Sequence, residues 1–212
     1  TDFDVVAWVK GEMRVMLNEE IARAVLVGDG RASGAEDKIN EQNIRPIWKD
    51  DDFYTIHKSV TIAPAATNYD KAEAIIEAAL RARKDYKGSG TPDAFFDPDT
   101  ITTMLLAKDT TGRRIYNSIS DLASALRVKN IYEVPVFEGL ERTDAQSKKH
   151  TLLGIIVNLT DYNIGADKGG SVNLFDDFDI DYNKFTYLIE TRCSGALVRP
   201  YSAIVIETAP TE

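Results

Sequence analysis

Apolar residues recur at steps of three and four from Val5 to Val27, with charged residues between them. Such a spacing places the apolar side chains on one side of a helix, so the pattern predicts a helix over residues 5–27. Its length would be roughly 34 Å, at about 1.5 Å per residue, which is long for a globular protein and typical of a structural strut. A second helical pattern covers residues 68–87, with acidic residues in its first turn and basic residues in its last.

Two shorter helices follow, and each has a start signal in the sequence. Asp97 and Pro98 begin one of them directly after a short apolar strand at 93–96, and Ser118 or Ser120 begins the other. Gly112 closes a turn between the two. We therefore expect two helices joined by a turn.

Strand patterns occupy most of the remaining chain. Alternation of apolar and polar residues predicts a strand over residues 53–63. After residue 130 most segments are strand-like, and a polar excursion at 140–150 is long enough to protrude. Helices in the first half and a β-rich end predict the α+β class.

The stretch AVLVGDGRASG, residues 24–34, raises the question of a phosphate-binding loop. A dinucleotide fingerprint requires the spacing G-x-G-x-x-G between a strand and a following helix. Here Ser33 occupies the third glycine position, and the glycines follow a helix instead of opening one. We therefore interpret Gly28 as the cap of the first helix, where a left-handed backbone costs glycine nothing, and Gly30 as the point where the chain turns away.

Composition narrows the classes of function. The chain has 212 residues, of which 43% are hydrophobic, enough for one large domain or two small ones. Its 25 basic and 34 acidic residues give a net charge of −9, and the basic residues are scattered. This balance argues against a protein that grips duplex nucleic acid, because neutralising phosphates needs clustered lysines and arginines.

The sequence also gives no signal for secretion or membrane insertion. Cys193 is the only cysteine, so the fold does not depend on an internal disulfide. No apolar run approaches the roughly 20 residues of a membrane span, and the acidic start TDFDVVAWVKGEM is unlike a signal peptide. Because the chain begins abruptly in a helical pattern, we expect that an N-terminal part is missing.

Three segments, in this order, carry a family resemblance. A long helix ends in GDG at 28–30, the segment AFFDPDTITTMLLAKDTTGRRIY at 94–116 follows a second helix, and KFTYLIETRCSGALVRPYSAIVIE at 184–207 lies close to the end. Together they resemble the major capsid protein of tailed bacteriophages, whose fold is shared with encapsulin shells. The resemblance covers nearly all of the chain.

The resemblance implies an L-shaped subunit. Residues 1–42 would be the end of the peripheral domain with its spine helix, residues 43–192 the axial domain, and residues 193–212 strands that return to the peripheral domain. The implied function is self-assembly, as hexamers and pentamers of an icosahedral shell around phage or prophage DNA. The expected structural residues are Gly28, Gly30, Gly112, Gly195 and Pro200.

The same resemblance implies partners and a location. A scaffold, a maturation protease and a portal are expected, with enclosed double-stranded DNA bound without sequence specificity, no cofactor and no membrane. The place would be the virion capsid, assembled in the host bacterial cytoplasm. The chain lacks the N-terminal arm and extended loop that precede the spine helix in this family, so we expect a chain that was cleaved in maturation or trimmed.

Two alternatives stay open at this point. An encapsulin-like compartment would use the same shell to enclose a cargo enzyme instead of a genome. A small α+β enzyme acting through the acidic strand cluster around Glu190 belongs to a different class, and loss of activity in a Glu190→Gln variant would support it.

One acidic segment imitates a calcium loop. Asp179, Asp181, Asn183 and Glu190 occupy relative positions 1, 3, 5 and 12 of such a loop. Position 6 requires glycine for its sharp turn and holds Lys184. Because alternating side chains on a strand explain the same spacing, we favour solvated carboxylates over a metal site.

Asn183 and Glu190 have a second interpretation, which the resemblance supplies. Some members of the family join neighbouring subunits by an isopeptide bond between a lysine of the extended loop and an asparagine of this region, helped by a glutamate seven residues on. The spacing here is the same. A poorly solvated carboxylate would take the proton of the lysine, and the neutral amine would attack the amide and release ammonia.

Little else in the sequence indicates catalysis. His57 lies in a strand pattern and His150 in the polar excursion, so we interpret both as structural or solvated. KDDDF, at 49–53, is typical of a solvated turn. No nucleophile elbow, HExxH pair or cysteine cluster occurs in the sequence. We therefore expect no enzymatic activity other than autocatalytic cross-linking.

Overall fold

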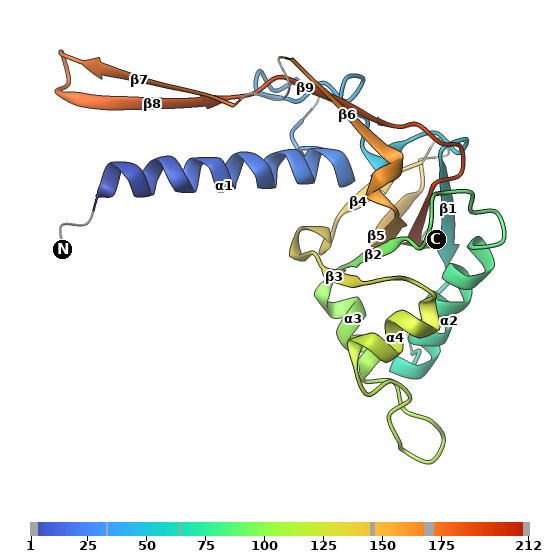
Figure 1. Cartoon of the computed structure of the whole chain (residues 1–212). Helices are drawn as coiled ribbons and strands as arrows, with labels where there is room; N and C mark the ends of the chain where they lie inside the picture. Colours follow the sequence, from blue (N-terminus) through green and yellow to red (C-terminus); the bar gives the residue numbers. More distant parts are fainter. Residues whose placement is uncertain (1–3, 33, 64, 145–146, 168–171, 210–212) are drawn as a thin grey trace. The chain divides into compact units, whose positions relative to one another are not determined.

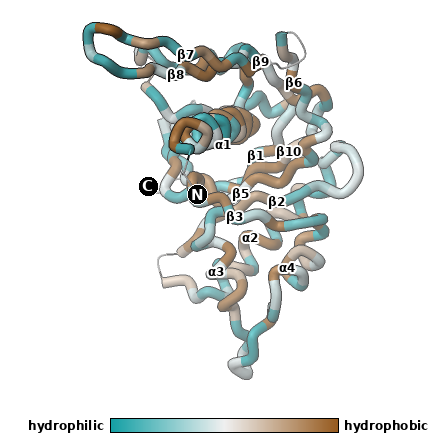
Figure 2. Tube along the Cα trace, turned by 60° about the vertical axis from the view of Figure 1, so that its left-hand side comes forward, coloured by the Kyte–Doolittle hydropathy of each residue, from teal (hydrophilic) through white to brown (hydrophobic). Residues whose placement is uncertain are grey.

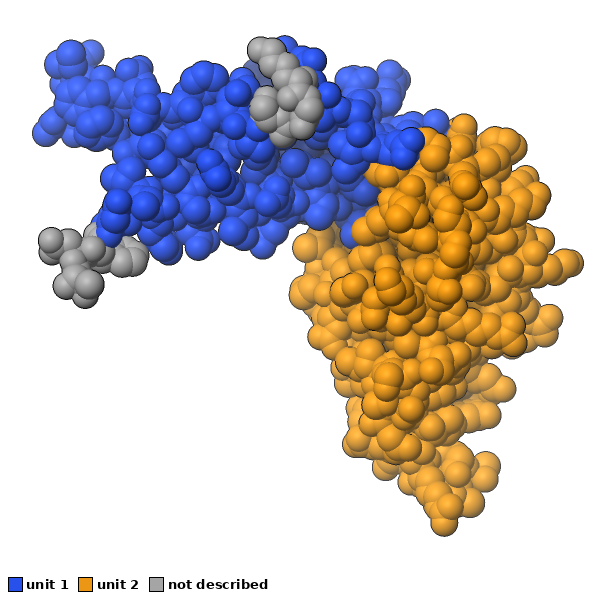
Figure 3. All heavy atoms as spheres, viewed as in Figure 1, with its two compact units in different colours: residues 1–46, 163–196 blue, residues 47–162, 197–212 orange. Residues whose placement is uncertain are grey.

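The structure is a computed structural model, and it confirms the α+β class (Figure 1). It describes residues 4–32, 34–63, 65–144, 147–167 and 172–209. The chain divides into two compact units (Figure 3). The first unit comprises Thr1–Pro46 and Asn163–Ala196, and the second comprises Ile47–Tyr162 and Leu197–Glu212.

The boundaries between the two units differ from the domain boundaries that the resemblance implied. It crosses after residues 46, 162 and 196, whereas the expected boundaries were 42 and 192. Residues 163–192 therefore group with the long helix, and the last strand groups with the second unit. Which unit is peripheral and which is axial stays a prediction.

A six-stranded sheet forms the centre of the second unit, in the order β1-β10-β5-β2-β3, with β4 paired to β5. Strand β1 is parallel to β10, β2 is parallel to β3, and the remaining pairs are antiparallel. In Figure 2 the hydrophobic colour covers much of β5 and β10, two of the inner strands of this sheet. The strands are β1 (Thr55–Val60), β2 (Asp93–Phe96), β3 (Ile131–Glu133), β4 (Glu141–Thr143), β5 (Lys149–Val157) and β10 (Ala203–Thr208).

Three helices cover one face of the sheet, and all three begin at a predicted residue. Thr67 caps α2 (Asn68–Ala82), with Asp70 completing a reciprocal capping box, and the helix ends five residues before the expected position 87. The side chain of Asp97 caps α3 (Pro98–Leu105), and that of Ser118 caps α4 (Ile119–Leu126). The main core lies between these helices and the sheet and includes Ile56, Ile75, Phe96, Ile101, Leu122, Ile156, Ile204 and Ile206.

Short 3-10 helices lie along the second unit. Ile47 and Trp48, in η1 (Ile47–Lys49), are almost fully buried. The carbonyl of Ile47 accepts a hydrogen bond from Thr55, which alternates along β1 with the core residue Ile56, so η1 covers the other face of the sheet. The other two are η2 (Pro135–Phe137) and η3 (Leu159–Asp161).

The polar excursion at 140–150 is not a plain loop. Its first part forms β4, and Arg142 pairs with His150 in the antiparallel register of β4 and β5. The excursion is therefore mostly a hairpin, although residues 145–146 lie outside the described ones. Antiparallel pairing satisfies the backbone groups that a long loop would leave to water.

The first unit contains the predicted long helix, α1 (Val5–Leu26). The strands β7 (Asn173–Asp179) and β8 (Lys184–Glu190) form an antiparallel hairpin, and β6 (Tyr162–Ala166) pairs with β9 (Cys193–Leu197). Lys10 on α1 lies 3.3 Å from a carboxylate oxygen of Asp176 and 5.2 Å from the ring centroid of Tyr187. These contacts place one face of the hairpin against the helix.

Candidate functional site

The acidic segment singled out in the sequence forms the turn of the β7–β8 hairpin. Asp179 ends β7, and its Oδ1 accepts hydrogen bonds from the backbone N–H groups of Asp181 at 3.2 Å and Tyr182 at 3.3 Å. Asn183 has a left-handed backbone with φ of 48°, a conformation that asparagine tolerates better than most residues. The carboxylate of Asp179 thus stabilises the turn.

Glu190 lies at the other end of this hairpin. It pairs with Asn173, whereas Lys184, the residue next to Asn183, pairs with Asp179. At about 3.3 Å per residue, seven residues of strand separate Glu190 from Asn183 by roughly 20 Å. The structure therefore does not bring Glu190 to Asn183 or to the carboxylates of the turn, and no set of three potential metal-ligating side chains gathers among the described residues.

Three of the glycines expected to be structural, Gly28, Gly30 and Gly112, have left-handed backbones outside the helices and strands. Gly28 follows α1 with φ of +89°, a conformation nearly free of cost for glycine, and its N–H donates to the carbonyl of Arg23. Gly30 and Gly112 also have positive φ angles, of +71° and +81°.

Gly195 and Pro200 lie in the segment 184–207, the last of the three that carry the family resemblance. The N–H of Gly195 donates to Asn43, and its carbonyl accepts from Arg45, both at 2.8 Å, so Gly195 joins β9 to the segment that follows α1. Pro200 lies in the turn before β10, where the hydroxyl of Ser202 donates to the carbonyl of Arg199 at 2.8 Å. Whether the wider family requires these residues stays a prediction.

A buried charge cluster in the second unit was missed by the sequence analysis. The carboxylate of Glu207 on β10 is fully buried and accepts hydrogen bonds from Arg142 and from the indole Nε1 of Trp48. The hydrogen bond from Arg142 to Glu207 raises the pKa of the guanidinium. A lone glutamate in the apolar segment SAIVIET was the only hint that the sequence offered.

Both histidines lie beside this cluster. His150 is buried in β5, which corrects its placement in a polar loop, and its Nε2 lies 3.1 Å from Asp144 while its Nδ1 lies 3.8 Å from Glu207. His57 on β1 contacts the carboxylate of Asp52 and the carbonyl of Trp48, each at 2.9 Å. The two rings therefore tie the loops to the sheet.

A polar cavity of about 860 Å³ opens at the cluster. Its walls include both histidines, Arg142, Asp52 and Asp144. These side chains are already engaged in the pairs described above, which is the pattern of a structural network that fixes β1, β4, β5 and β10.

Among the described residues, no helix combines the length and the apolar character needed to cross a membrane.

The arrangement of elements has clear structural relatives. The chain is 12% identical to the solved structure "Capsid of empty GTA particle computed with C5 symmetry", with a TM-score of 0.61, and the match covers 99% of this chain and 68% of that one. For the capsid of Myoviridae phage XM1 the identity is 7%, the TM-score 0.61 and the coverage 98% and 66%. For a chain of Mycobacterium phage Cain the identity is 11% and the TM-score 0.59, and the match covers 100% of this chain and 68% of that one.

These likenesses establish the fold, and the chain spans about two thirds of each of those chains. Curated protein sequences give no match. The model of the phage capsid family matches residues 1–208. Because that match extends over nearly the whole sequence, the chain belongs to the phage capsid family and is a structural capsid protein.

Proposed function

We propose that copies of this chain join as hexamers and pentamers of an icosahedral shell around phage or prophage DNA. In this arrangement the second unit is the axial domain, which gathers around the five-fold and six-fold axes. The first unit is the peripheral domain, with α1 as its spine helix. Membership of the phage capsid family supports the shell, and the packing of the first unit supports this division.

The observation that carries the proposal is the open packing of α1 and the hairpin. No side chain from Val5 to Arg23 is buried, and none in β7 or β8. A two-stranded hairpin is at best marginally stable in water without a further layer. The helix and hairpin therefore need a cover that this single chain does not supply among its described residues.

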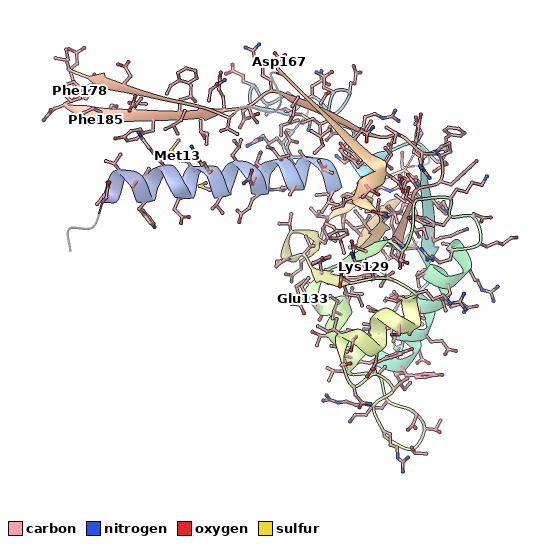
Figure 4. The ribbon with its side chains drawn as sticks, in the orientation of Figure 1. Met13, Lys129, Glu133, Asp167, Phe178 and Phe185 are labelled. Carbon is pink, nitrogen blue, oxygen red and sulfur yellow. The ribbon has the colours of Figure 1, made fainter. Side chains whose placement is uncertain are left out.

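Large apolar side chains lie on this uncovered part. Phe178 and Phe185 pair across the hairpin near its turn, with ring centroids 4.9 Å apart (Figure 4). Phe185 is 64% exposed and Ile180, in the turn, is 81% exposed. Exposed apolar patches of this kind mark protein interaction sites, and in a shell the neighbouring copies would cover them.

The proposal also covers how the shell holds its DNA and which partners take part in assembly. The net charge of −9 opposes tight adhesion of DNA to the wall of the shell, so the enclosed duplex would be held by confinement and not by sequence-specific contacts. Assembly would take place in the bacterial cytoplasm with a scaffold, a maturation protease and a portal.

For the contacts between copies we infer a non-covalent shell. Glu190 lies roughly 20 Å from Asn183 along β8, too far to take a proton from an amine that attacks Asn183 of the same chain. An isopeptide bond would need Glu190 from another copy. The mass of denatured shells tests this inference. Only the monomer mass is expected, and a species of two chains less one ammonia would contradict the inference.

A single substitution tests the role of the hairpin. Phe185→Ser should abolish shells or rings in electron micrographs while the circular dichroism of the chain is unchanged, because the side chain is exposed. Leu159→Ser, at an exposed apolar residue of the second unit, is the control and should assemble normally. Normal assembly of Phe185→Ser would contradict the proposed use of the hairpin.

A further inference from the structure

Between α3 and α4 the second unit carries a rigid projection, which we call the finger and define as residues 107–115. The chain runs outward and back. The backbones of Lys108 and Arg114 form an isolated antiparallel β-bridge, and the N–H of Ile115 donates to the carbonyl of Ala107 at 3.1 Å. Figure 1 shows the finger projecting beyond α3 and α4, and Figure 2 shows it largely in the hydrophilic colour.

Asp109 fixes the tip of the finger. Its Oδ1 accepts hydrogen bonds from the N–H of Thr111 at 2.8 Å, from the hydroxyl of Thr111 at 2.7 Å and from the N–H of Arg113 at 2.9 Å. The hydrogen bond from the Thr111 hydroxyl is the main cause that lowers the pKa of this carboxyl. The finger is thus preorganised, and little conformational entropy remains to be lost if it binds a partner.

The finger displays three cations. Lys108, Arg113 and Arg114 are exposed, and none of them forms an ion pair with any residue that the structure describes. The one carboxylate of the finger, Asp109, points to the backbone of its own turn. The positive charge of the finger is therefore available to another molecule.

A groove of about 630 Å³ lies at the base of the finger, along α2. Its floor is mainly apolar, and its acidic residues are Glu73 and Glu77. Glu77 pairs with Arg81 at 2.6 Å, whereas Glu73 has no ion pair among the described residues. The lining consists of Tyr69, Ala72, Glu73, Ile76, Glu77, Leu80, Arg81, Ala107, Ile115 and Tyr116.

The finger does not fill the groove of its own chain. Its base residues Ala107 and Ile115 form part of the lining, and its cations make no ion pair with Glu73. One molecule thus carries a basic projection and, at the base of that projection, a groove with acidic residues and an apolar floor. Two unlike and complementary surfaces on one subunit produce a head-to-tail contact, which closes into a ring when the rotation between copies allows it.

We propose that the finger of one copy docks into the α2 groove of the next copy in a ring, with Arg113 and Arg114 facing Glu73 and Glu77 of that neighbour. Apolar contact with the floor of the groove would contribute affinity, and the charges would fix register and direction. The inference rests on the proposed function, because it assigns the contact that builds the hexamer and pentamer.

Charge reversal tests the contact in both directions. Variant A carries Arg113→Glu and Arg114→Glu, and variant B carries Glu73→Lys and Glu77→Lys. Each alone sets like charges against each other, so the concentration needed for ring formation, measured by mass photometry, should rise at least about tenfold. A chain that carries all four substitutions should form rings again, because the charges are complementary once more.

Mixing the two variants gives a sharper result. In an alternating ring, each acidic finger of A meets a basic groove of B, and each basic finger of B meets an acidic groove of A. Alternation requires an even number of copies, so the mixture should recover six-membered rings and not five-membered ones. A control variant carries Lys84→Glu and Lys129→Glu, which is the same change of charge as in variant A. Both lysines are exposed and lie outside the finger (Lys129 is labelled in Figure 4), so this variant should assemble normally.

The outcomes separate this inference from the proposed function. An unmodified chain that forms no rings contradicts both. If the unmodified chain assembles and variants A and B assemble equally well, only the finger contact is overturned. Failure of A and B without recovery in the four-substitution chain overturns it as well, provided that urea unfolding midpoints show all variants to be folded.

Discussion

Arg142 holds the fully buried carboxylate of Glu207 through two hydrogen bonds, from Nε to Oε1 at 2.5 Å and from Nη2 to Oε2 at 2.8 Å. Trp48 donates a third, from its indole to Oε1 at 2.5 Å. These residues come from β4, β10 and the 3-10 helix η1. These hydrogen bonds therefore connect the last strand of the chain to two segments that lie much earlier in the sequence.

Breaking this pair should destabilise the second unit strongly. Glu207→Gln leaves the guanidinium of Arg142 partly buried without its counter-charge, which typically costs about 3 kcal/mol of unfolding free energy. Urea unfolding followed by the fluorescence of Trp48, in a Trp8→Phe background, measures the change. Glu77→Gln removes an exposed pair and should cost less than about 0.5 kcal/mol. A loss below about 1 kcal/mol in Glu207→Gln would show that the pair is not important for stability.

Gly154 on β5 should not tolerate a side chain. It lies opposite Phe96 in the sheet, and a Cβ atom at this position would come within 2.1 Å of the phenyl ring. Gly154→Ala must displace a fully buried ring, so we expect a loss of about 1–3 kcal/mol in urea unfolding.

Gly11→Ala is the matched control. A Cβ atom at Gly11 meets nothing within 4 Å, and the residue lies inside α1, so alanine should be neutral or stabilise by up to about 1 kcal/mol. Equal effects of the two substitutions would contradict the close contact between Gly154 and Phe96.

Asp29 should make the first unit sensitive to acid. Burial opposes its ionisation, but hydrogen bonds from Lys38 at 2.8 Å and from the N–H groups of Ile39 and Arg31 prevail and lower its pKa from 3.8 to about 2. Because the pKa is lower in the folded state, the stabilisation is fully present above pH 4 and is lost as the pH falls from about 4 to 2.

The comparison with Asp29→Asn isolates this effect. The variant should be less stable than the unmodified chain by about 2 kcal/mol at pH 7, and the difference should shrink towards zero at pH 2. Urea unfolding at both pH values, followed by circular dichroism, gives the two differences. A difference that does not depend on pH would contradict the lowered pKa of Asp29.

Elements with local signals could be predicted from the sequence. The helix start at Asp97 and Pro98 and the left-handed Gly28 just after α1 depend on residues a few positions apart, and the structure has both features. The buried cluster could not be predicted in this way. Trp48 and Glu207 are 159 residues apart, and only the parallel pairing of β1 with β10 brings their segments together.

The hairpin shows a second limit of the sequence patterns. Leu174, Phe178, Phe185 and Ile189 lie on one face of the hairpin and have the apolar character that predicted two strands, and the strands exist. Alternation alone does not show that an apolar face lacks a cover within the chain, because strands in a complete core have the same pattern. Likewise, the matching spacing of Asn183 and Glu190 did not show that the strand between them holds the two residues of one chain apart. Cross-linking between copies stays a prediction.

Negative-stain electron microscopy of the protein, produced from its whole coding region together with the neighbouring genes, tests the central claim most directly. We expect closed shells of uniform diameter, or rings of five and six copies. A folded chain that stays monomeric at every concentration, even with a scaffold and protease present, would contradict self-assembly as the function.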